Sequence, residues 1–445
     1  MDRDIRLKNY RSPEIQIQPR GGRSTTLLQK NLLTKLAEAG ANVLPITVDS
    51  NTRLEKYEKA EALYAHSLTH GVDSLNGFPF MAVPSDEIVE MISKFENPVS
   101  LRHGSPVAHK LVEKALLCGI DEIEGGPLTY SLPYTRNTSL AVSIESWKKV
   151  ERMCASSKTR LNQGVLRESF GVLTAVLVPP YVALLVSFLE AIFSYSNGVR
   201  HFMIGLQSSG NLIQDIVQFD AARRVASSLA GAYFPDLHLY YAYHHWMGPF
   251  PRDSAQANSI IDICNLSAHL VKADKVVVKT NVEAYGVPSE ESNAYAVRRT
   301  RKLLLLMASM DAADKSGTEE EVSFLTSEVL AGIHRILTSD SLDDSLIRAV
   351  ESGQIDLMFS PHQAVRRRIE VYRDRKGWVR LFDPGELLVS REFQLFERRG
   401  TTEVFNRLTS KKILSDMLWP RKVNRHLAEE IANLRSHSGV DLYDG

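Results

Sequence analysis

The chain is poor in cysteine and has no excess of charge of either sign. Its 445 residues include three cysteines, and 53 basic side chains are matched by 53 acidic ones. Cys118, Cys154 and Cys264 lie far apart and form no CxxC pair, which disfavours a disulfide framework or a zinc site. Zero formal net charge disfavours a nucleic acid or an anionic membrane as partner. Free thiols and balanced charge predict a cytoplasmic protein.

The chain also lacks an uninterrupted membrane-spanning run. The apolar segment 171–193 has the required length, but Pro179-Pro180 interrupts it and Glu190 lies in its second half. We predict a buried strand, a two-proline turn and a core helix there. The first 14 residues are charged and lack the apolar stretch of a signal peptide.

Short apolar runs alternate with helical patterns about eight times. This alternation predicts an α/β fold with a parallel sheet and, at this length, a (β/α)8 TIM barrel. The strands are expected at 15–18, 43–48, 98–102, 120–124, 172–178, 200–206, 237–243 and 274–279. The helices are expected at 27–39, 55–68, 84–95, 106–118, 181–195, 211–230, 254–272 and 289–312. The segment 78–83 is interpreted as a loop.

The pattern changes near residue 313, which predicts three parts. Residues 1–14 are expected to form an N-terminal arm, and 15–312 the barrel that carries the substrate and cofactor site. Residues 313–445 are predicted to form a C-terminal α+β extension with possible dimer or subunit contacts. Within it we expect a helix near 320–337, short strands and turns over 354–390, and helices over 391–436.

Three arginines follow successive apolar runs of the predicted barrel. Arg20 and Arg53 follow the first two predicted strands and Arg102 ends the third, where barrel enzymes place their active sites. A guanidinium group binds a carboxylate through two parallel hydrogen bonds. If the three converge, they form a pocket for a small di- or tri-anion. The alternative is three ordinary surface or salt-bridged arginines.

The segment EGGPLTYSLPYTRN, 124–137, has the densest group of polar and aromatic residues. Glu124 could receive a substrate ammonium, and Tyr130 and Tyr134 could donate hydrogen bonds to a carboxylate. A structured turn with core tyrosines explains the same residues. His103 is interpreted either as a general base or as a loop histidine, and Glu168 either as a buried acid or as a connector residue.

Two later segments each have more than one explanation. Lys279 could be a Schiff-base nucleophile, a hydrogen-bond donor to a cofactor, or a partner of Glu283 four residues on. In HHWMGPFPRD, 244–253, adjacent histidines on a strand point to opposite faces, which disfavours a zinc pair. We expect Trp246 in the core and Phe250 in the wall of a flat ligand site.

Together the motifs resemble one family. QPRGG, LPITVDSNTR, SLNGFP, RHGSP, EGGPLTYSLPYTRN, FGVLTAVLVPP, SGNLIQDI, HHWMGPFP and VVVKTNVEAYGVP occur in this order over roughly residues 15–390. This set resembles the epsilon subunit of glutamate mutase, also called methylaspartate mutase. The resemblance implies an isomerase that interconverts L-glutamate and (2S,3S)-3-methylaspartate by a radical carbon-skeleton rearrangement. It also implies a barrel homodimer that forms a heterotetramer with a small cobalamin-binding (sigma) subunit.

The resemblance assigns roles to individual residues. It implies a substrate pocket formed by Arg20, Arg53, Arg102, His103, Glu124, Tyr130 and Tyr134. It implies adenosylcobalamin contacts at Gly22, Asn76, Pro133, Phe250, Lys279, Glu283 and Val287. Supporting positions are Thr47, Glu168, His244 and Met247. The cobalt-ligating motif D-x-H-x-x-G is absent from the sequence, so the metal ligand is expected from the small subunit.

Two departures from the family pattern concern the N-terminus and the cofactor positions. The chain begins nearer its first strand than is typical, which affects the expected N-terminal covering or dimer contacts. Val287 and the Asn281-Val282 pair also differ from the commonest family residues. Two other functions are considered: a Schiff-base barrel lyase that uses Lys279, and a non-catalytic subunit that docks a cobalamin protein.

Overall fold

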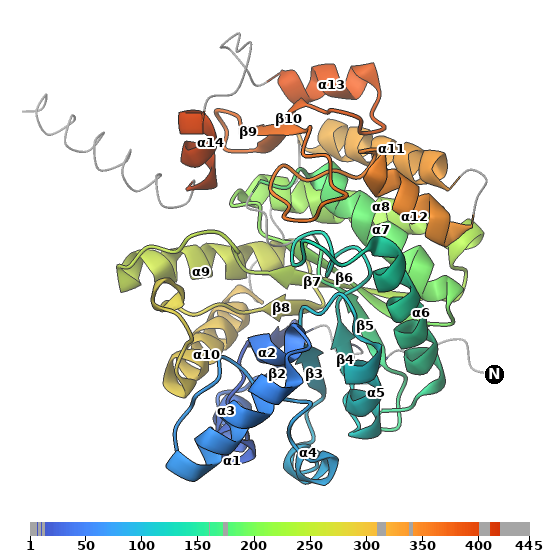
Figure 1. Cartoon of the computed structure of the whole chain (residues 1–445). Helices are drawn as coiled ribbons and strands as arrows, with labels where there is room; N and C mark the ends of the chain where they lie inside the picture. The colour runs from blue at the N-terminus through green and yellow to red at the C-terminus, as the bar shows by residue number, and fades with distance from the viewer. Residues whose placement is uncertain are drawn as a thin grey trace, which may run out of the picture.

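Eight parallel strands form a nearly closed barrel in the computed structural model (Figure 1). The model describes Leu7, Tyr10 and residues 14–159, 161–171, 177–308, 317–337, 341–399 and 410–418. The strands are β1 (Gln16–Gln18), β2 (Leu44–Thr47), β3 (Val99–Arg102), β4 (Glu122–Glu124), β5 (Leu166–Ser169), β6 (His201–Gln207), β7 (His238–His244) and β8 (Lys275–Val277). Ladders join neighbours around the barrel from β2 to β8 and on to β1. Between β2 and β1, the Thr47 N–H donates to the Gly21 carbonyl (2.9 Å).

Helices surround this sheet, as the alternating pattern predicted. They are α1 (Thr26–Glu38), α2 (Ser50–Arg53), α3 (Tyr57–His70), α4 (Ser85–Ile92), α5 (His109–Leu117), α6 (Leu140–Ser156), α7 (Pro180–Ser196), α8 (Leu212–Tyr233), α9 (Ser254–Leu270), the 3₁₀ turn η2 (Glu283–Tyr285) and α10 (Glu290–Met307). The apolar segment after Pro179 forms α7, which is buried from Pro180 to Ser194. Because α7 packs against the barrel on one side and the extension on the other, most of its residues on every side are apolar. The (β/α)8 prediction is therefore confirmed, and 78–83 is a loop.

The predicted position of the fifth strand was wrong. Residues 172–176 lie outside the described part of the chain, Leu177 and Val178 form no strand, and β5 is the preceding segment LRES. Two charged residues interrupt the apolar pattern of this strand. Arg167 faces outward and binds Glu151 of α6 (Nε to Oε2, 2.9 Å), while Glu168 faces the barrel interior.

The barrel interior is unusually polar. Alternate positions of each strand face inward, and several of these carry charged side chains that are almost fully buried. These are Arg102, Glu122, Glu124, Glu168 and Lys275. At the opposite end from the predicted site, Leu7 and Tyr10 pack on an apolar group inside the barrel. That group is Leu166, Met203, Tyr240 and Ala242.

The C-terminal extension packs over α7 and α8 (orange to red in Figure 1). It contains α11 (Glu319–Ile336), α12 (Leu342–Glu351), the antiparallel pair β9 (Glu370–Arg373) and β10 (Val379–Asp383), α13 (Arg391–Arg398) and α14 (Ser410–Met417). It also contacts two loops at the carboxyl ends of the strands. Ser360 Oγ donates to the Leu132 carbonyl (2.6 Å), and Arg373 Nη2 donates to the Ser209 carbonyl (2.6 Å).

The α+β extension is therefore confirmed, whereas the boundaries of the three parts stay a prediction. The expected boundary at 312/313 and the expected helical residues 419–436 lie outside the described ranges. The three cysteines are buried and unpaired, as the composition indicated. No helix of the described residues is long and apolar enough to cross a membrane, and these residues contain no group of metal-ligating side chains.

Asp356 organises the loop that joins α12 to β9. Its buried carboxylate accepts hydrogen bonds from four backbone N–H groups at 2.6–3.1 Å: those of Leu357, Arg367, Arg368 and Ile369. We expect Asp356→Ala to lower the free energy of unfolding by about 3 kcal/mol, because buried N–H groups lose a charged acceptor. Urea denaturation measures this, with the exposed Asp383→Ala as control. Equal midpoints for the two variants would contradict the assignment.

Candidate active site

The three arginines converge at the carboxyl ends of the strands. Arg20 lies two residues beyond β1, Arg53 ends the short helix α2, and Arg102 is the last residue of β3. Burial raises the pKa of the Tyr134 phenol, and the positive charges of all three guanidinium groups oppose that shift. Tyr134 is therefore within electrostatic reach of all three. Of the alternative, ordinary surface or salt-bridged arginines, the salt bridge is present at Arg102, which is buried beside Glu124.

Arg102 is the most deeply buried of the three, with 2 % of its surface exposed. It forms an ion pair with Glu124, and its Nη1 lies 3.9 Å from Glu168 Oε2. Burial lowers the pKa of Arg102, while the Glu168 carboxylate acts in the opposite direction. Glu124 also accepts a hydrogen bond from the Tyr130 hydroxyl. Glu124, which the sequence suggested as a partner for a substrate ammonium, thus lies next to Arg102 and Tyr130 of the same predicted pocket.

Aromatic rings form one wall of this pocket. The Tyr130 ring meets those of Tyr134 (centroids 5.5 Å apart), Phe170 (5.6 Å) and His103 (4.9 Å) edge-on. The Phe170 ring in turn contacts His244 at 5.6 Å. These contacts limit the movement of both tyrosines and leave little space for water between the rings.

His103 is held as a neutral hydrogen-bond donor. The Ser105 N–H donates to His103 Nδ1 (3.1 Å), so the proton of the neutral ring is on Nε2. Burial, with Arg167 and Arg53 nearby, lowers the pKa of His103 to about 3. Nε2 is buried and has no hydrogen-bond partner within the described residues. This geometry suits a donor to a ligand oxygen better than the general base considered from the sequence.

A chain of buried charges lies beneath Arg102. Lys275 Nζ donates to Glu122 Oε2 (2.8 Å) and to Glu168 Oε2 (2.7 Å). Glu168 Oε1 is 3.0 Å from His244 Nε2, and burial lowers the pKa of His244 to about 4, so this histidine is a neutral donor. Burial alone would raise the pKa of Glu168, but Lys275, His244 and Arg102 hold it well below its usual range. Glu168 is therefore a buried acid, as one of the two interpretations proposed.

Two members of this chain of charges, Lys275 and Glu122, were not predicted from the sequence. Tyr10 Oη donates to Glu122 Oε1 (3.1 Å), so the arm residue at the base of the barrel contacts the same network. Lys275 lies at the start of the apolar run that Lys279 ends, away from the carboxyl ends of the strands where barrel sites are expected. In β8 Lys275 is followed by two valines, so no alternation of polar and apolar residues marks it as an interior side chain.

A hollow of about 560 Å³ opens on the β7–β8 side of the barrel mouth. Lys279 and Glu283 line it and form an ion pair (Nζ to Oε2, 2.6 Å). Burial, together with Arg20, lowers the pKa of Lys279, and Glu283 opposes this. Phe250 and Met247 supply apolar lining. The pairing of Lys279 with Glu283 considered from the sequence is thus present at the edge of a ligand-sized space.

A second hollow of about 300 Å³ lies beside Arg53 and Tyr134.

The remaining predicted cofactor positions are spread around the mouth. Gly22 has no room for a side chain, because a Cβ there would lie 2.0 Å from the Thr47 carbonyl oxygen. Asn76 Oδ1 accepts from the Ser50 N–H (3.0 Å), and Pro133 lies between the two tyrosines in sequence. Val287 is 61 % exposed beyond η2 and does not line the 560 Å³ hollow. Of the seven predicted cofactor positions, Phe250, Lys279 and Glu283 line the 560 Å³ hollow, and the other four are not part of its lining.

Comparisons with known proteins agree over most of the chain. Residues 5–416 match the model of the family described as methylaspartate mutase E chain. The chain is 37% identical over 375 residues to the glutamate mutase epsilon subunit of Haloarcula marismortui, covering 83% of this chain and 76% of that protein. It is 34% identical to the protein of the same name from Halobacterium salinarum (87% and 82% covered) and 35% identical to that from Desulfitobacterium hafniense (86% and 79% covered).

Proposed function

Because the chain belongs to the methylaspartate mutase E chain family, we propose that it is the catalytic large subunit of a glutamate mutase. In this proposal it interconverts L-glutamate and (2S,3S)-3-methylaspartate, an isomerase reaction. Adenosylcobalamin is held in part by a separate small subunit that supplies the cobalt ligand. Two copies of this chain and two small subunits form the working heterotetramer.

The convergence of the three arginines with Glu124 carries this proposal. L-Glutamate has two carboxylates and one ammonium at neutral pH, and a guanidinium fork matches each carboxylate. Arg20, Arg53 and Arg102 place three positive charges around Tyr134, and Glu124 supplies a carboxylate beside Arg102. This arrangement complements an amino acid that carries two carboxylates and one ammonium.

The substrate roles follow from where each group lies. Arg20, Arg53 and Arg102 bind the two carboxylates, and Glu124 accepts from the ammonium. Tyr134 and the Nε2–H of His103 donate to carboxylate oxygens. The aromatic wall around Tyr130 keeps water away from the reacting carbons, which a reactive intermediate requires. Fixing both ends of a flexible amino acid also holds its carbon skeleton in one orientation.

The 560 Å³ hollow fits part of a large cofactor with both flat and hydroxylated parts. Phe250 and Met247 offer apolar surface, and the Lys279–Glu283 pair offers a donor and an acceptor for ribose hydroxyls. When bound, adenosylcobalamin supplies the radical that removes a hydrogen atom from the substrate. The protein groups orient the substrate carboxylates and amine, exclude water and keep the pocket charges balanced.

The two other functions fit less well. A Schiff-base lyase needs a free amine, whereas Lys279 is paired with Glu283. Borohydride trapping of substrate on Lys279 would support that lyase. A non-catalytic docking subunit has no need of the buried arginine and carboxylate groups that this pocket retains.

Anaerobic reconstitution tests the proposal. The full chain is mixed with the cognate small subunit, adenosylcobalamin and L-glutamate, and proton NMR follows the methyl doublet of 3-methylaspartate. We expect product only when all four components are present. An assembled complex that forms no product from L-glutamate would contradict the proposed activity, and a panel of amino acids would then be screened by the cob(II)alamin signal.

A further inference from the structure

The two tyrosines of the pocket lie on a segment that is neither a regular helix nor a strand. Residues 127–134 form consecutive turns, with backbone bonds such as Tyr130 N–H to the Gly126 carbonyl (3.1 Å) and Leu132 N–H to the Leu128 carbonyl (2.9 Å). The N–H groups at the start of such a segment have no partner within it. Something outside the segment must bind them if Tyr130 and Tyr134 are to stay in one position.

Glu190 of α7 binds these N–H groups. Its Oε1 accepts from the Leu128 N–H (2.8 Å) and the Thr129 N–H (2.9 Å), and its Oε2 accepts from Thr129 Oγ1 (2.9 Å). Gly126 passes so close that a Cβ would lie 2.3 Å from the Glu190 carboxylate. The segment therefore rests directly on this side chain.

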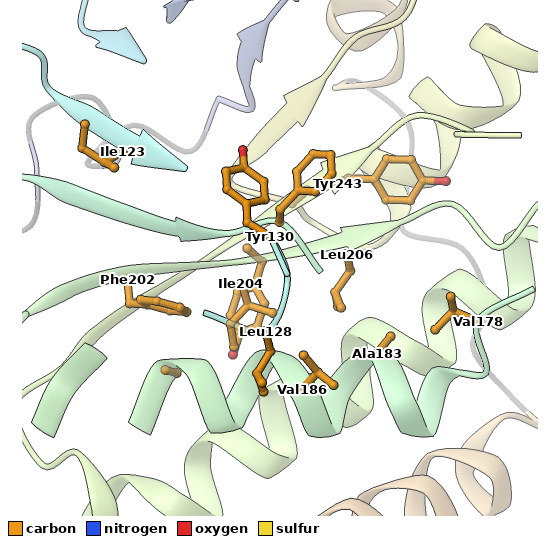
Figure 2. Close-up of a cluster of buried hydrophobic side chains, with 14 of the residues drawn as sticks. Ile123, Leu128, Tyr130, Val178, Ala183, Val186, Phe202, Ile204, Leu206 and Tyr243 are labelled. Atoms are coloured by element: carbon orange, nitrogen blue, oxygen red, sulfur yellow. The ribbon is translucent and has the colours of Figure 1, made fainter. Parts of the chain in front are cut away.

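A carboxylate is costly at this position. Glu190 is almost fully buried in a helix that is otherwise largely apolar, and Figure 2 shows Leu128 above the same helix, near Val186. Burying a charge without an opposite charge is unfavourable unless hydrogen bonds replace its hydration. Arg167 of β5 acts on Glu190 only at a distance and is itself bonded to Glu151 of α6. The hydrogen bonds from the Leu128 N–H, the Thr129 N–H and the Thr129 hydroxyl thus replace the lost hydration of the Glu190 carboxylate.

We propose that Glu190 is the positioning residue of the substrate pocket: its ionised carboxylate holds the 126–134 segment so that Tyr130 and Tyr134 face the substrate. Glu190 has no hydrogen bond to either tyrosine, so it acts through the backbone. The proposal deepens the proposed function and rests on it.

The protonation state of Glu190 makes this role measurable. Burial raises its pKa to about 7, although the hydrogen bonds from Thr129 and Leu128 and the charge of Arg167 lower it. The ionised form accepts all three bonds. Protonation removes the negative charge from the acceptor of the Leu128 and Thr129 N–H bonds, which weakens both, and it turns Oε2 into a donor, so its bond with Thr129 Oγ1 must reverse or break. The segment should therefore loosen as the pH falls through 7, and the KM for L-glutamate should rise.

Glu190→Gln tests the proposal in the reconstituted complex. We expect the KM for L-glutamate to rise at least tenfold at pH 8, with a smaller change in kcat. The wild-type KM should rise between pH 8 and pH 6, and that dependence should be missing in the variant. The matched control is Glu328→Gln, a buried carboxylate that binds the Ser390 N–H (2.9 Å) in the extension. It should lower stability without changing the KM or its pH dependence.

A second readout requires no turnover. Hydrogen exchange of the 126–134 backbone, measured by mass spectrometry on the full chain, should be faster in Glu190→Gln than in wild type or Glu328→Gln. Unchanged exchange together with a wild-type KM and pH profile would overturn the proposal. If the wild-type complex has no mutase activity, the proposed function fails, and exchange still decides: faster exchange supports Glu190 as the residue that holds the segment, and unchanged exchange refutes it.

Discussion

Arg102→Lys is expected to lower kcat/KM for L-glutamate roughly 100-fold, because it keeps the charge but removes the guanidinium fork. Arg102 is fully enclosed and contacts Glu124 and Glu168, so water cannot replace a lost hydrogen bond. A charged hydrogen bond contributes up to about 3 kcal/mol, and about 1.4 kcal/mol corresponds to tenfold in rate. Lysine presents a point charge and cannot bind a carboxylate and Glu124 in parallel.

The measurement is steady-state kinetics in the reconstituted complex, with Arg380→Lys as the matched control. Arg380 is a largely buried arginine of the extension that bridges Asp374 and Glu397. Its replacement should reduce thermal stability and leave kcat/KM within about twofold of wild type, as for a site with no substrate contact. Wild-type kinetics in Arg102→Lys would show that Arg102 does not hold the substrate.

The second large effect is expected from Lys275→Met, which leaves two buried carboxylates without their shared ammonium group. Lys275 bridges Glu122 and Glu168 within hydrogen-bond distance of both. Removing one partner of a buried ion pair costs about 3–5 kcal/mol because the remaining charge stays desolvated. We expect a loss of this size in the free energy of unfolding at pH 7.5, measured by urea denaturation.

The pH dependence of Lys275→Met distinguishes lost charge from lost packing. In the wild type, Lys275 helps to hold the pKa of Glu168 below the value of this group in the unfolded chain. The ionised carboxylate of Glu168 therefore stabilises the fold above the unfolded pKa, and this contribution is lost as the pH falls below about 4.5. Without Lys275, burial and repulsion from Glu122 should raise the pKa of Glu168. The variant should then regain stability as the pH falls from 7.5 to 5.5, and its deficit should shrink.

Adding Glu122→Gln to Lys275→Met serves as the internal control. It removes one of the two stranded charges and should recover part of the lost stability at pH 7.5. A deficit that is the same at both pH values, and that Glu122→Gln does not reduce, would mean that packing and not charge accounts for the effect.

Local patterns predicted most of the barrel because each strand and helix buries its own apolar residues. Seven predicted strands lie within two residues of their observed bounds, and the predicted helices each correspond to one in the structure. The prediction of the fifth strand was wrong because this strand does not show the local apolar pattern. Arg167 and Glu168 interrupt its apolar pattern, and they are satisfied by α6 and by the barrel interior, which lie far away in sequence.

The sequence predicted those residues of the candidate site whose type and position along the chain already indicate a role. Arg20, Arg53 and Arg102 stood out because a charge that follows a buried strand is unusual. Lys275 did not stand out, because its two partners come from β4 and β5. Glu190 was visible only as a charge that made the apolar segment unsuited to a membrane.

The amino-acid sequence by itself determined the alternation of strands and helices, the arginines at the carboxyl ends of three strands and the identity of the groups that could bind an anionic amino acid. These depend on periodicity and on side-chain chemistry, which are local properties. Only the tertiary structure decided which charges meet across the barrel, that His103 is a neutral donor, and that Glu190 holds the segment of the two tyrosines. Those outcomes depend on burial and on contacts between strands and helices distant in sequence, and burial is what makes each unpaired charge costly enough to require its partner.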